Sequence, residues 1–214
     1  MSTAQQARAC LALAALLGLL SDCALTSKGE ALYPRFFSPE PEMAAAELPV
    51  PAGSPLALRL GQVEAASHID ERFAYRREPS ELSYYEERRW TEAPDRYLRR
   101  ALERELFERR GVKRIVSGPG ATLDVELTAF EELRGPPARV RLSLSFSLHD
   151  DRHSQLERSL LVERPLPPSA DGASAREVTG ALSLALTAAV LEISQQVTGQ
   201  LQAPTSEAPV SMEH

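Results

Sequence analysis

The chain has 214 residues, a length that suits one domain with short appendages. Hydrophobic residues make up 43% of it and charged residues 25%, so its composition can supply an ordinary packed core. The formal net charge of -6 argues against general nucleic-acid binding, which needs many cationic contacts to phosphate.

The first 22 residues have the pattern of an export signal. Arg8 supplies a positive charge, and an almost wholly apolar run follows from residue 9 to residue 20. A helix of that length rises about 18 Å, which is too short for a bilayer core of about 30 Å, so the run favours a signal segment over a membrane span. Leu20-Ser21-Asp22-Cys23 then resembles a bacterial lipobox, although Asp22 replaces the small residue that usually precedes the cysteine.

This pattern predicts cleavage before Cys23 and a covalent lipid on that cysteine. Two or more acyl chains hold a protein stably at a membrane, whereas one chain holds it only marginally. Cys10 leaves with the signal, so the predicted mature chain keeps a single cysteine and can form no disulfide within itself. Ala24, directly after the cysteine, favours the outer membrane over the inner membrane. The alternative is a plain secretory signal with an incidental cysteine.

Between the anchor and residue 93 the chain is predicted to be mostly extended. A short edge strand is expected at Tyr33 to Phe37, followed by a connector with five prolines. Three further strands are expected from alternating apolar and polar residues, at 56–64, 69–75 and 82–88. The last two are predicted to form a hairpin.

The rest of the chain is predicted to form two helices and three longer strands. The first helix, 94–110, begins at Pro94, carries an apolar stripe at helical spacing and ends at Gly111. Alternation predicts the strands at 123–130, 140–148 and 156–162. An Ala- and Leu-rich helix is expected from about 173 to 201.

These elements predict an α+β fold. Strands in hairpins imply mainly antiparallel pairing, and two helices can cover the apolar face of the sheet, so we expect a two-layer sandwich. The predicted organisation is a signal peptide at 1–22, a lipidated N-terminus with its Pro-rich connector at 23–55, the folded domain at 56–202 and a disordered tail at 203–214.

Aromatic and structural motifs spread over this domain form a recognisable series. They are Tyr75-Arg76, Tyr84-Tyr85, Trp90 with Pro94, the helix ending at Gly111, a strand ending at Phe130-Glu131, and a final helix with Ala181-Leu182. Over roughly residues 31 to 200 the chain resembles the ABC-type transport auxiliary lipoproteins, which include the lipoprotein component of the Pqi system. The resemblance implies a non-catalytic protein without a cofactor. Its partner would be a substrate-binding MCE-domain protein, in a system linked to lipid movement between inner and outer membranes.

Two clusters with catalytic or metal-ligating residue types are predicted to be turns. His149-Asp150-Asp151-Arg152-His153 lies between two alternating runs, so a solvated hairpin turn is favoured over a zinc site. Ser117-Gly118-Pro119-Gly120 lacks the Lys-Ser/Thr of a phosphate-binding loop. We therefore predict no metal site and no enzymatic activity.

Two other clusters are candidates for binding. The basic one, at the end of the first helix, either compensates the helix dipole or contacts anionic head groups or an acidic partner; it comprises Arg109, Arg110, Lys113 and Arg114. The aromatic one either packs the hairpin onto the helix or forms a partner-contact surface; it comprises Tyr75, Tyr84, Tyr85 and Trp90. Because Tyr84 and Tyr85 are neighbours in a strand, they are predicted to face opposite ways.

The main functional hypothesis is a lipid-anchored, non-catalytic subunit that docks onto an MCE-type partner, with self-association left open. Tethering would let a modest docking affinity suffice. One alternative is a lipid- or small-molecule-binding lipoprotein that acts alone, which needs an apolar cavity between helix and sheet. Another is a surface enzyme, whose activity would depend on His149 or His153.

Overall fold

A computed structural model describes residues 33–40, 56–168 and 172–203. The chain divides into a first unit, Met1–Tyr33, and a second unit, Pro34–His214, and the fold below is that of the second unit. The predicted signal, Cys23, most of the Pro-rich connector and the predicted tail lie outside the described residues.

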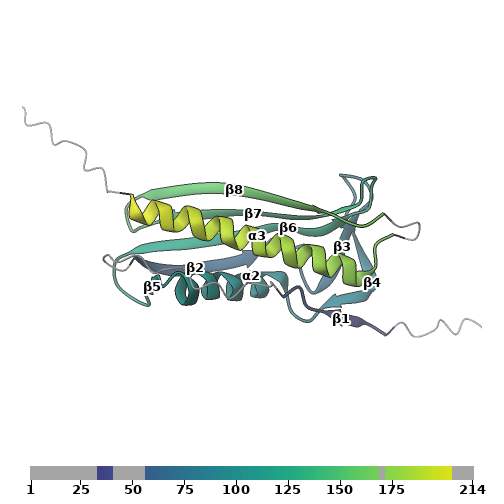
Figure 1. Cartoon of the computed structure of the whole chain (residues 1–214), viewed down its shortest axis with the longest axis horizontal. Helices are drawn as coiled ribbons and strands as arrows, with labels where there is room; N and C mark the ends of the chain where they lie inside the picture. Colours follow the sequence, from purple (N-terminus) through teal and green to yellow (C-terminus); the bar gives the residue numbers. More distant parts are fainter. Residues whose placement is uncertain (1–32, 41–55, 169–171, 204–214) are drawn as a thin grey trace, which may run out of the picture. The chain divides into compact units, whose positions relative to one another are not determined.

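The described chain forms one sheet of eight strands (Figure 1). The strands are β1 (Arg35–Phe37), β2 (Ala57–Ala65), β3 (Arg72–Arg76), β4 (Ser83–Trp90), β5 (Lys113–Arg114), β6 (Ala121–Leu133), β7 (Arg139–His149) and β8 (Ser154–Pro165). The long strand β6 organises them. It pairs with β7 along one edge, and β7 pairs with β8.

The other edge of β6 is shared by two strands, and both run parallel to it. The first half of β6 pairs with β2, from Leu58 opposite Ala121 to Ala65 opposite Leu127. The second half pairs with β3, where Ala74 lies opposite Glu131. The pairs β1–β4 and β2–β5 are also parallel, whereas β3–β4, β6–β7 and β7–β8 are antiparallel. The prediction of a mainly antiparallel sheet is therefore wrong: the sheet is mixed, because β6 returns beside β2 and β3 only after a helical crossover.

The alternating pattern of the long strands is confirmed. In β7 the even-numbered residues from Val140 to Leu148 are buried, and the odd-numbered residues between them are partly exposed. The sheet thus has one apolar face and one polar face, as expected for a sheet covered by helices on one side only.

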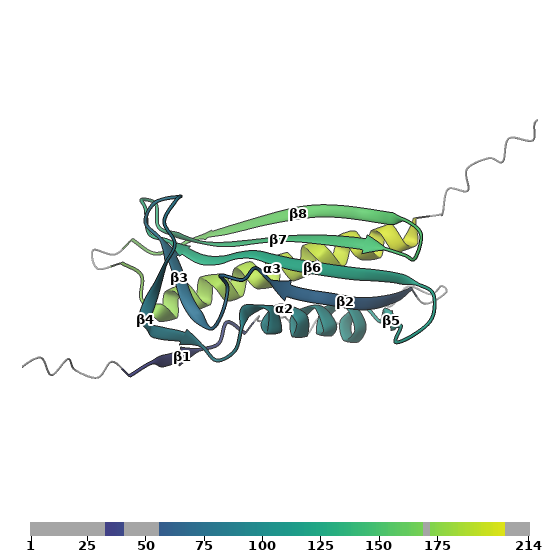
Figure 2. The same ribbon diagram turned by 180° about the vertical axis from the view of Figure 1, so that it is seen from behind.

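Two helical segments cover the apolar face (Figures 1 and 2). Helix α2 (Pro94–Glu103) packs on β2, helix α3 (Ala175–Gln202) packs on β7 and β8, and the two helices contact each other. A capping box begins α3: Ser174 Oγ accepts a hydrogen bond from Glu177 N, and Glu177 Oε2 accepts one from Ser174 N. The predicted two-layer arrangement with two helices is confirmed.

The first helix does not continue as an α-helix to residue 110. After Glu103 it widens into a π-helix, η1 (Arg104–Arg109), in which Arg110 N donates to Glu105 O over five residues. Glu105 is fully buried, and its carboxylate binds Arg109 and Arg110 at 2.6 and 2.9 Å. Arg110 also reaches Thr198 Oγ1 on α3 at 3.5 Å, so the π-helix links the two helical segments.

Helix α3 alone among the described residues is long and apolar enough to cross a bilayer by length and composition. Half of its most apolar stretch is buried inside the fold. Its buried residues include Val178, Leu182, Leu186, Val190 and Ile193, which recur at helical spacing. The core therefore accounts for the buried half of this stretch, whereas Leu184 and Leu191 on α3 are exposed.

Candidate partner-contact surface

The three tyrosines of the β3–β4 hairpin lie on two different faces, as predicted for Tyr84 and Tyr85. The Tyr85 ring lies 6.5 Å from the ring of the core residue Phe73 and 4.8 Å from that of Tyr75, between ring centroids. Tyr84 instead donates its hydroxyl to the carbonyl of His68 at 2.7 Å, and the guanidinium of Arg72 lies 3.8 Å from its ring centroid. Tyr75 and Tyr85 therefore form one feature and Tyr84 another.

Trp90 belongs to the core. Its side chain is 1% exposed, stacks on Phe73 at a centroid distance of 3.6 Å, and meets the edge of Phe130 at 5.3 Å. For Trp90 the partner-contact alternative is therefore wrong and the packing alternative holds, because β4 ends with this residue turned into the helix-covered layer.

Two arginines complete what we call the tyrosine–arginine cluster: Tyr75, Tyr85, Arg88 and Arg134. The guanidinium carbon of Arg134 lies 4.8 Å from the centroid of Tyr75 and 5.1 Å from that of Tyr85, and that of Arg88 lies 3.9 Å from Tyr85. Cation–π contacts of this kind stabilise a ring by about 0.5–2 kcal/mol each. Arg88 lies three residues after Tyr85 in β4, and its contact with that ring was not predicted. Sequence spacing gave no sign of Arg134 either, because the parallel β3–β6 pairing brings it to the hairpin.

A buried carboxylate lies beneath the cluster. Glu132 is 1% exposed, accepts a hydrogen bond from the Tyr85 hydroxyl at 2.5 Å, and lies 3.7 Å from Arg134. Burial, together with the hydrogen bond to Glu132, raises the pKa of Tyr85 far above its usual range. Tyr85 is therefore a neutral hydroxyl donor at physiological pH, and its ring is held in one position.

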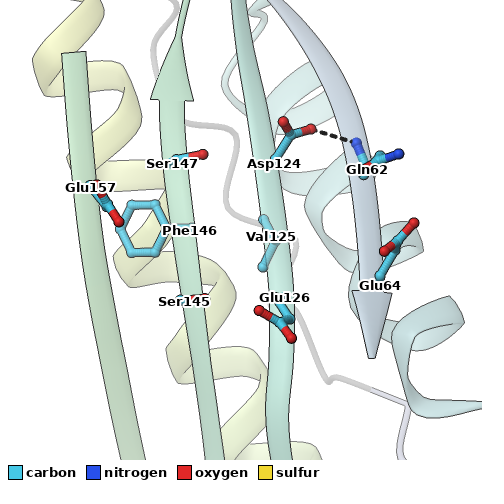
Figure 3. Close-up of a pocket in the computed structure, with 9 residues that line it drawn as sticks. All are labelled: Gln62, Glu64, Asp124, Val125, Glu126, Ser145, Phe146, Ser147 and Glu157. Atoms are coloured by element: carbon cyan, nitrogen blue, oxygen red, sulfur yellow. Dashed lines mark hydrogen bonds between the residues drawn. The ribbon is translucent and has the colours of Figure 1, made fainter. Parts of the chain in front are cut away.

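A separate, acidic pocket opens on the polar face of the sheet, with a volume of about 280 Å³ (Figure 3). Gln62 donates its backbone N–H to Asp124 Oδ1 at 2.6 Å within it. Its charged lining residues are all carboxylates: Glu64, Asp124, Glu126 and Glu157. Among the described residues, no group of three potential ligands is close enough to hold a metal ion.

The histidine cluster forms the β7–β8 turn, as predicted. His149 ends β7 and Ser154 begins β8. His149 Nε2 lies 2.8 Å from Asp124 Oδ2, whereas His153 Nδ1 lies 4.0 Å from Asp150. The two histidines thus pair with different carboxylates and do not converge.

We expect His149 to titrate at a higher pH than a free histidine. The hydrogen bond to Asp124 is the main cause that raises its pKa above 6.5. Since the folded-state pKa is the raised one, the pair stabilises the fold fully below the unfolded pKa and loses this effect as the pH rises through the folded pKa. Asp124→Asn should lower the pKa of His149 in an NMR titration, and Asp151→Asn, in the same turn, should leave it unchanged. Equal values in the wild type and Asp124→Asn would show that the contact does not persist in solution.

The basic cluster is largely engaged within the fold. Arg109 and Arg110 bind Glu105, and Arg114 lies 3.3 Å from Glu103 and 4.4 Å from the ring centroid of Phe107. These contacts favour the structural role over head-group contact.

A groove of about 630 Å³ lies between the β1 segment and the first half of α3. Phe36 and Leu184, which are 61% and 59% exposed, contribute apolar surface, and Arg176 and Ser183 contribute polar groups. This groove, which lies beside α3 at the surface, bears on the lipid-binding alternative.

Comparison with known proteins places this fold in a family. Residues 40–197 match the family described as "ABC-type transport auxiliary lipoprotein component". None of the curated proteins matches the chain.

Two of the similar solved structures share the fold at low sequence identity, and a third is given for comparison. Protein XCC0632 from Xanthomonas campestris is 20% identical, with a TM-score of 0.60 over 78% of this chain and 99% of that one. An uncharacterized protein is 15% identical, with a TM-score of 0.58 over 77% and 99% of the two chains. A minor lipoprotein from Acinetobacter baumannii is 14% identical, with a TM-score of 0.44 over 67% and 92%.

Proposed function

Because the chain belongs to the ABC-type transport auxiliary lipoprotein family, we propose that it is a membrane-anchored, non-catalytic subunit of an ABC/MCE-type envelope transport system. Its partner in this proposal is the MCE-domain protein that carries the substrate, and the substrate is lipid moving between the inner and outer membranes. Membership of the family associates the chain with the cell envelope and with transport; the partner and the substrate are the proposal.

The proposed anchor is a lipid on Cys23, at the periplasmic face of the outer membrane in preference to the inner one. Residues 24–34 separate Cys23 from the first strand, β1, so a short stretch of chain would hold the folded domain near the membrane. Tethering raises the effective concentration of the domain near any partner at the same membrane, so each docking contact can be weak.

The tyrosine–arginine cluster is the observation that carries the docking proposal. Tyr and Arg are enriched among residues that dominate binding energy at protein interfaces. Here the rings of Tyr75 and Tyr85 are already fixed by Arg134, Arg88 and the buried Glu132. Docking on them would therefore cost little side-chain entropy.

The docking proposal is tested by replacing Tyr75. This residue contacts the Tyr85 ring but takes no part in the Tyr85–Glu132 hydrogen bond, so its replacement leaves that bond in place. We expect Tyr75→Ala to weaken capture of the MCE-domain protein roughly 30-fold, the effect of losing about 2 kcal/mol. Tyr33→Ala is the matched control, because Tyr33 is 82% exposed. Affinity is measured with the purified partner, and circular dichroism confirms the fold of each variant. Unchanged affinity in Tyr75→Ala, or no capture by the wild type, would contradict the proposal.

The stand-alone alternative depends on the groove beside α3. In this alternative the exposed Phe36 and Leu184 hold the acyl chain of a bound lipid, and the protein itself carries no anchor. Lipid that co-purifies with the Cys23→Ala protein and is lost in Leu184→Glu would favour this alternative. Loss of partner capture in Tyr75→Ala with no bound lipid would favour the transport subunit.

A further inference from the structure

A pocket of about 240 Å³ lies at the edge of the polar sheet face, and four arginines line it. Arg76 ends β3 and Arg77 follows it, and Arg139 and Arg141 come from β7. Glu78 is the single acidic residue of the lining, and Pro79, Gly135 and Pro136 close the remaining sides. Parallel pairing of β3 with β6, and antiparallel pairing of β6 with β7, bring these residues together from distant parts of the chain.

Two carboxylates hold three of the arginines in position. Glu131, which is 3% exposed, accepts hydrogen bonds from Arg76 Nε at 3.0 and 2.9 Å. Glu163 on β8 binds Arg141 at 3.0 Å and Arg139 at 2.8 Å. The guanidinium groups are therefore oriented before any ligand arrives, which lowers the entropic cost of binding.

Donor capacity remains after these pairs are formed. Each guanidinium carries five N–H donors, and the carboxylates, together with the carbonyls of Pro79 and Pro137, accept only some of them. Arg77 forms no ion pair within the described part of the chain; its guanidinium lies 5.9 Å from the ring centroid of Tyr75. Four arginines lie beside three carboxylates (Glu78, Glu131 and Glu163), so the site keeps an excess of positive charge.

We propose that this pocket binds a phosphate group, carried by a phospholipid head group or by a small phosphate ester. The planar fork of arginine matches phosphate oxygens in bidentate pairs, and charge-assisted hydrogen bonds of this kind are the strong ones. Drug-sized ligands occupy pockets of about 300–1,000 Å³, so a pocket of about 240 Å³ suits a group as small as a head group. Phosphate binding at this site requires no protein partner, so its test is independent of the proposed docking.

Titration of the full-length Cys23→Ala chain with glycerol 3-phosphate tests the site, with glycerol as the uncharged control. We expect saturable binding of the phosphate ester alone. Arg77→Gln should weaken it about ten-fold, since a hydrogen bond to a charged group contributes about 1.5–3 kcal/mol. Glu78→Gln removes the lining carboxylate and should tighten binding. Arg96→Gln removes the same charge from α2, where Arg96 is 69% exposed, and should change nothing.

Vesicles identify the source of the phosphate. Stronger sedimentation with phosphatidylcholine vesicles that contain phosphatidylglycerol than with phosphatidylcholine alone, lost in Arg77→Gln, supports a lipid head group. Binding of glycerol 3-phosphate without any vesicle preference supports a soluble phosphate ester. The proposal is overturned if neither probe binds, if Arg77→Gln and Arg96→Gln weaken binding equally, or if Glu78→Gln does not strengthen it.

Discussion

Replacing Cys23 with alanine should move the protein from the membrane fraction to the soluble fraction almost completely. The proposed anchor supplies acyl chains whose burial contributes about 0.8 kcal/mol for each CH₂ group, and two or more chains hold a protein stably. The single head-group contact proposed for the four-arginine pocket would supply far less free energy than these chains. Metabolic labelling with a fatty-acid analogue, together with membrane fractionation, measures both consequences in the native host.

Cys10→Ala is the matched control for this experiment, because Cys10 lies in the predicted signal and leaves with it. Its labelling and fractionation should equal those of the wild type. Retention of label by Cys23→Ala would refute the anchor. An unmodified mature N-terminus in mass spectrometry would refute it as well. Either result would also remove the basis for the proposed tethering.

The second large effect is expected inside the fold, at the π-helix. Glu105→Ala should destabilise the protein by about 3–5 kcal/mol, the usual cost of breaking a buried ion pair by removing one partner. The fully buried carboxylate binds both Arg109 and Arg110, whose side chains are only 17% and 20% exposed. Removing it leaves two positive charges close together without the anion that they share, and leaves a cavity between η1 and α3.

Glu103→Ala supplies the comparison two residues earlier. Glu103 is 31% exposed, and its pair with Arg114 spans 3.3 Å, so its loss should cost about 1 kcal/mol or less. Urea unfolding at constant m-value gives both differences. Similar midpoints for the two variants would show that the buried carboxylate adds little to stability.

Patterning along single strands could be predicted, whereas their pairing could not. The alternation over Val140 to Leu148 specified which side chains of β7 are buried, because the period of a strand is two. It carries no information about strand direction, so the parallel positions of β2 and β3 beside β6 were missed. The two-residue strand β5 is too short to have a pattern at all.

The helix predicted over 94–110 shows a different limit. Its apolar stripe, from Leu98 to Leu106, reads as one α-helix, and both residues are fully buried as expected. A π-helix inserts an extra residue per turn without interrupting that stripe. The sign of it in the sequence is Glu105, a charged residue that falls within the buried stretch and needs the nearby arginines.

In the candidate partner-contact surface, too, some features could be predicted from the sequence and others could not. The opposite orientation of Tyr84 and Tyr85 follows from their adjacency in one strand, and the contacts of both confirm it. Arg134 lies 49 residues beyond Tyr85 in the chain and reaches its ring only through the β3–β6 pairing. Tertiary pairing of this kind leaves no trace in local spacing, so neither Arg134 nor the four-arginine pocket could be predicted.

The outer strand of the sheet has a consequence if the proposed anchor confines the protein to a membrane plane. Within the described residues β8 pairs with β7 alone, so a row of backbone donors and acceptors along its outer side is open to another strand. Along that strand Glu157, Arg158 and Arg164 are exposed. Mixed charges on an edge discourage a second sheet from joining it. With the proposed anchor, these charges would disfavour edge-to-edge joining of copies that share one membrane plane.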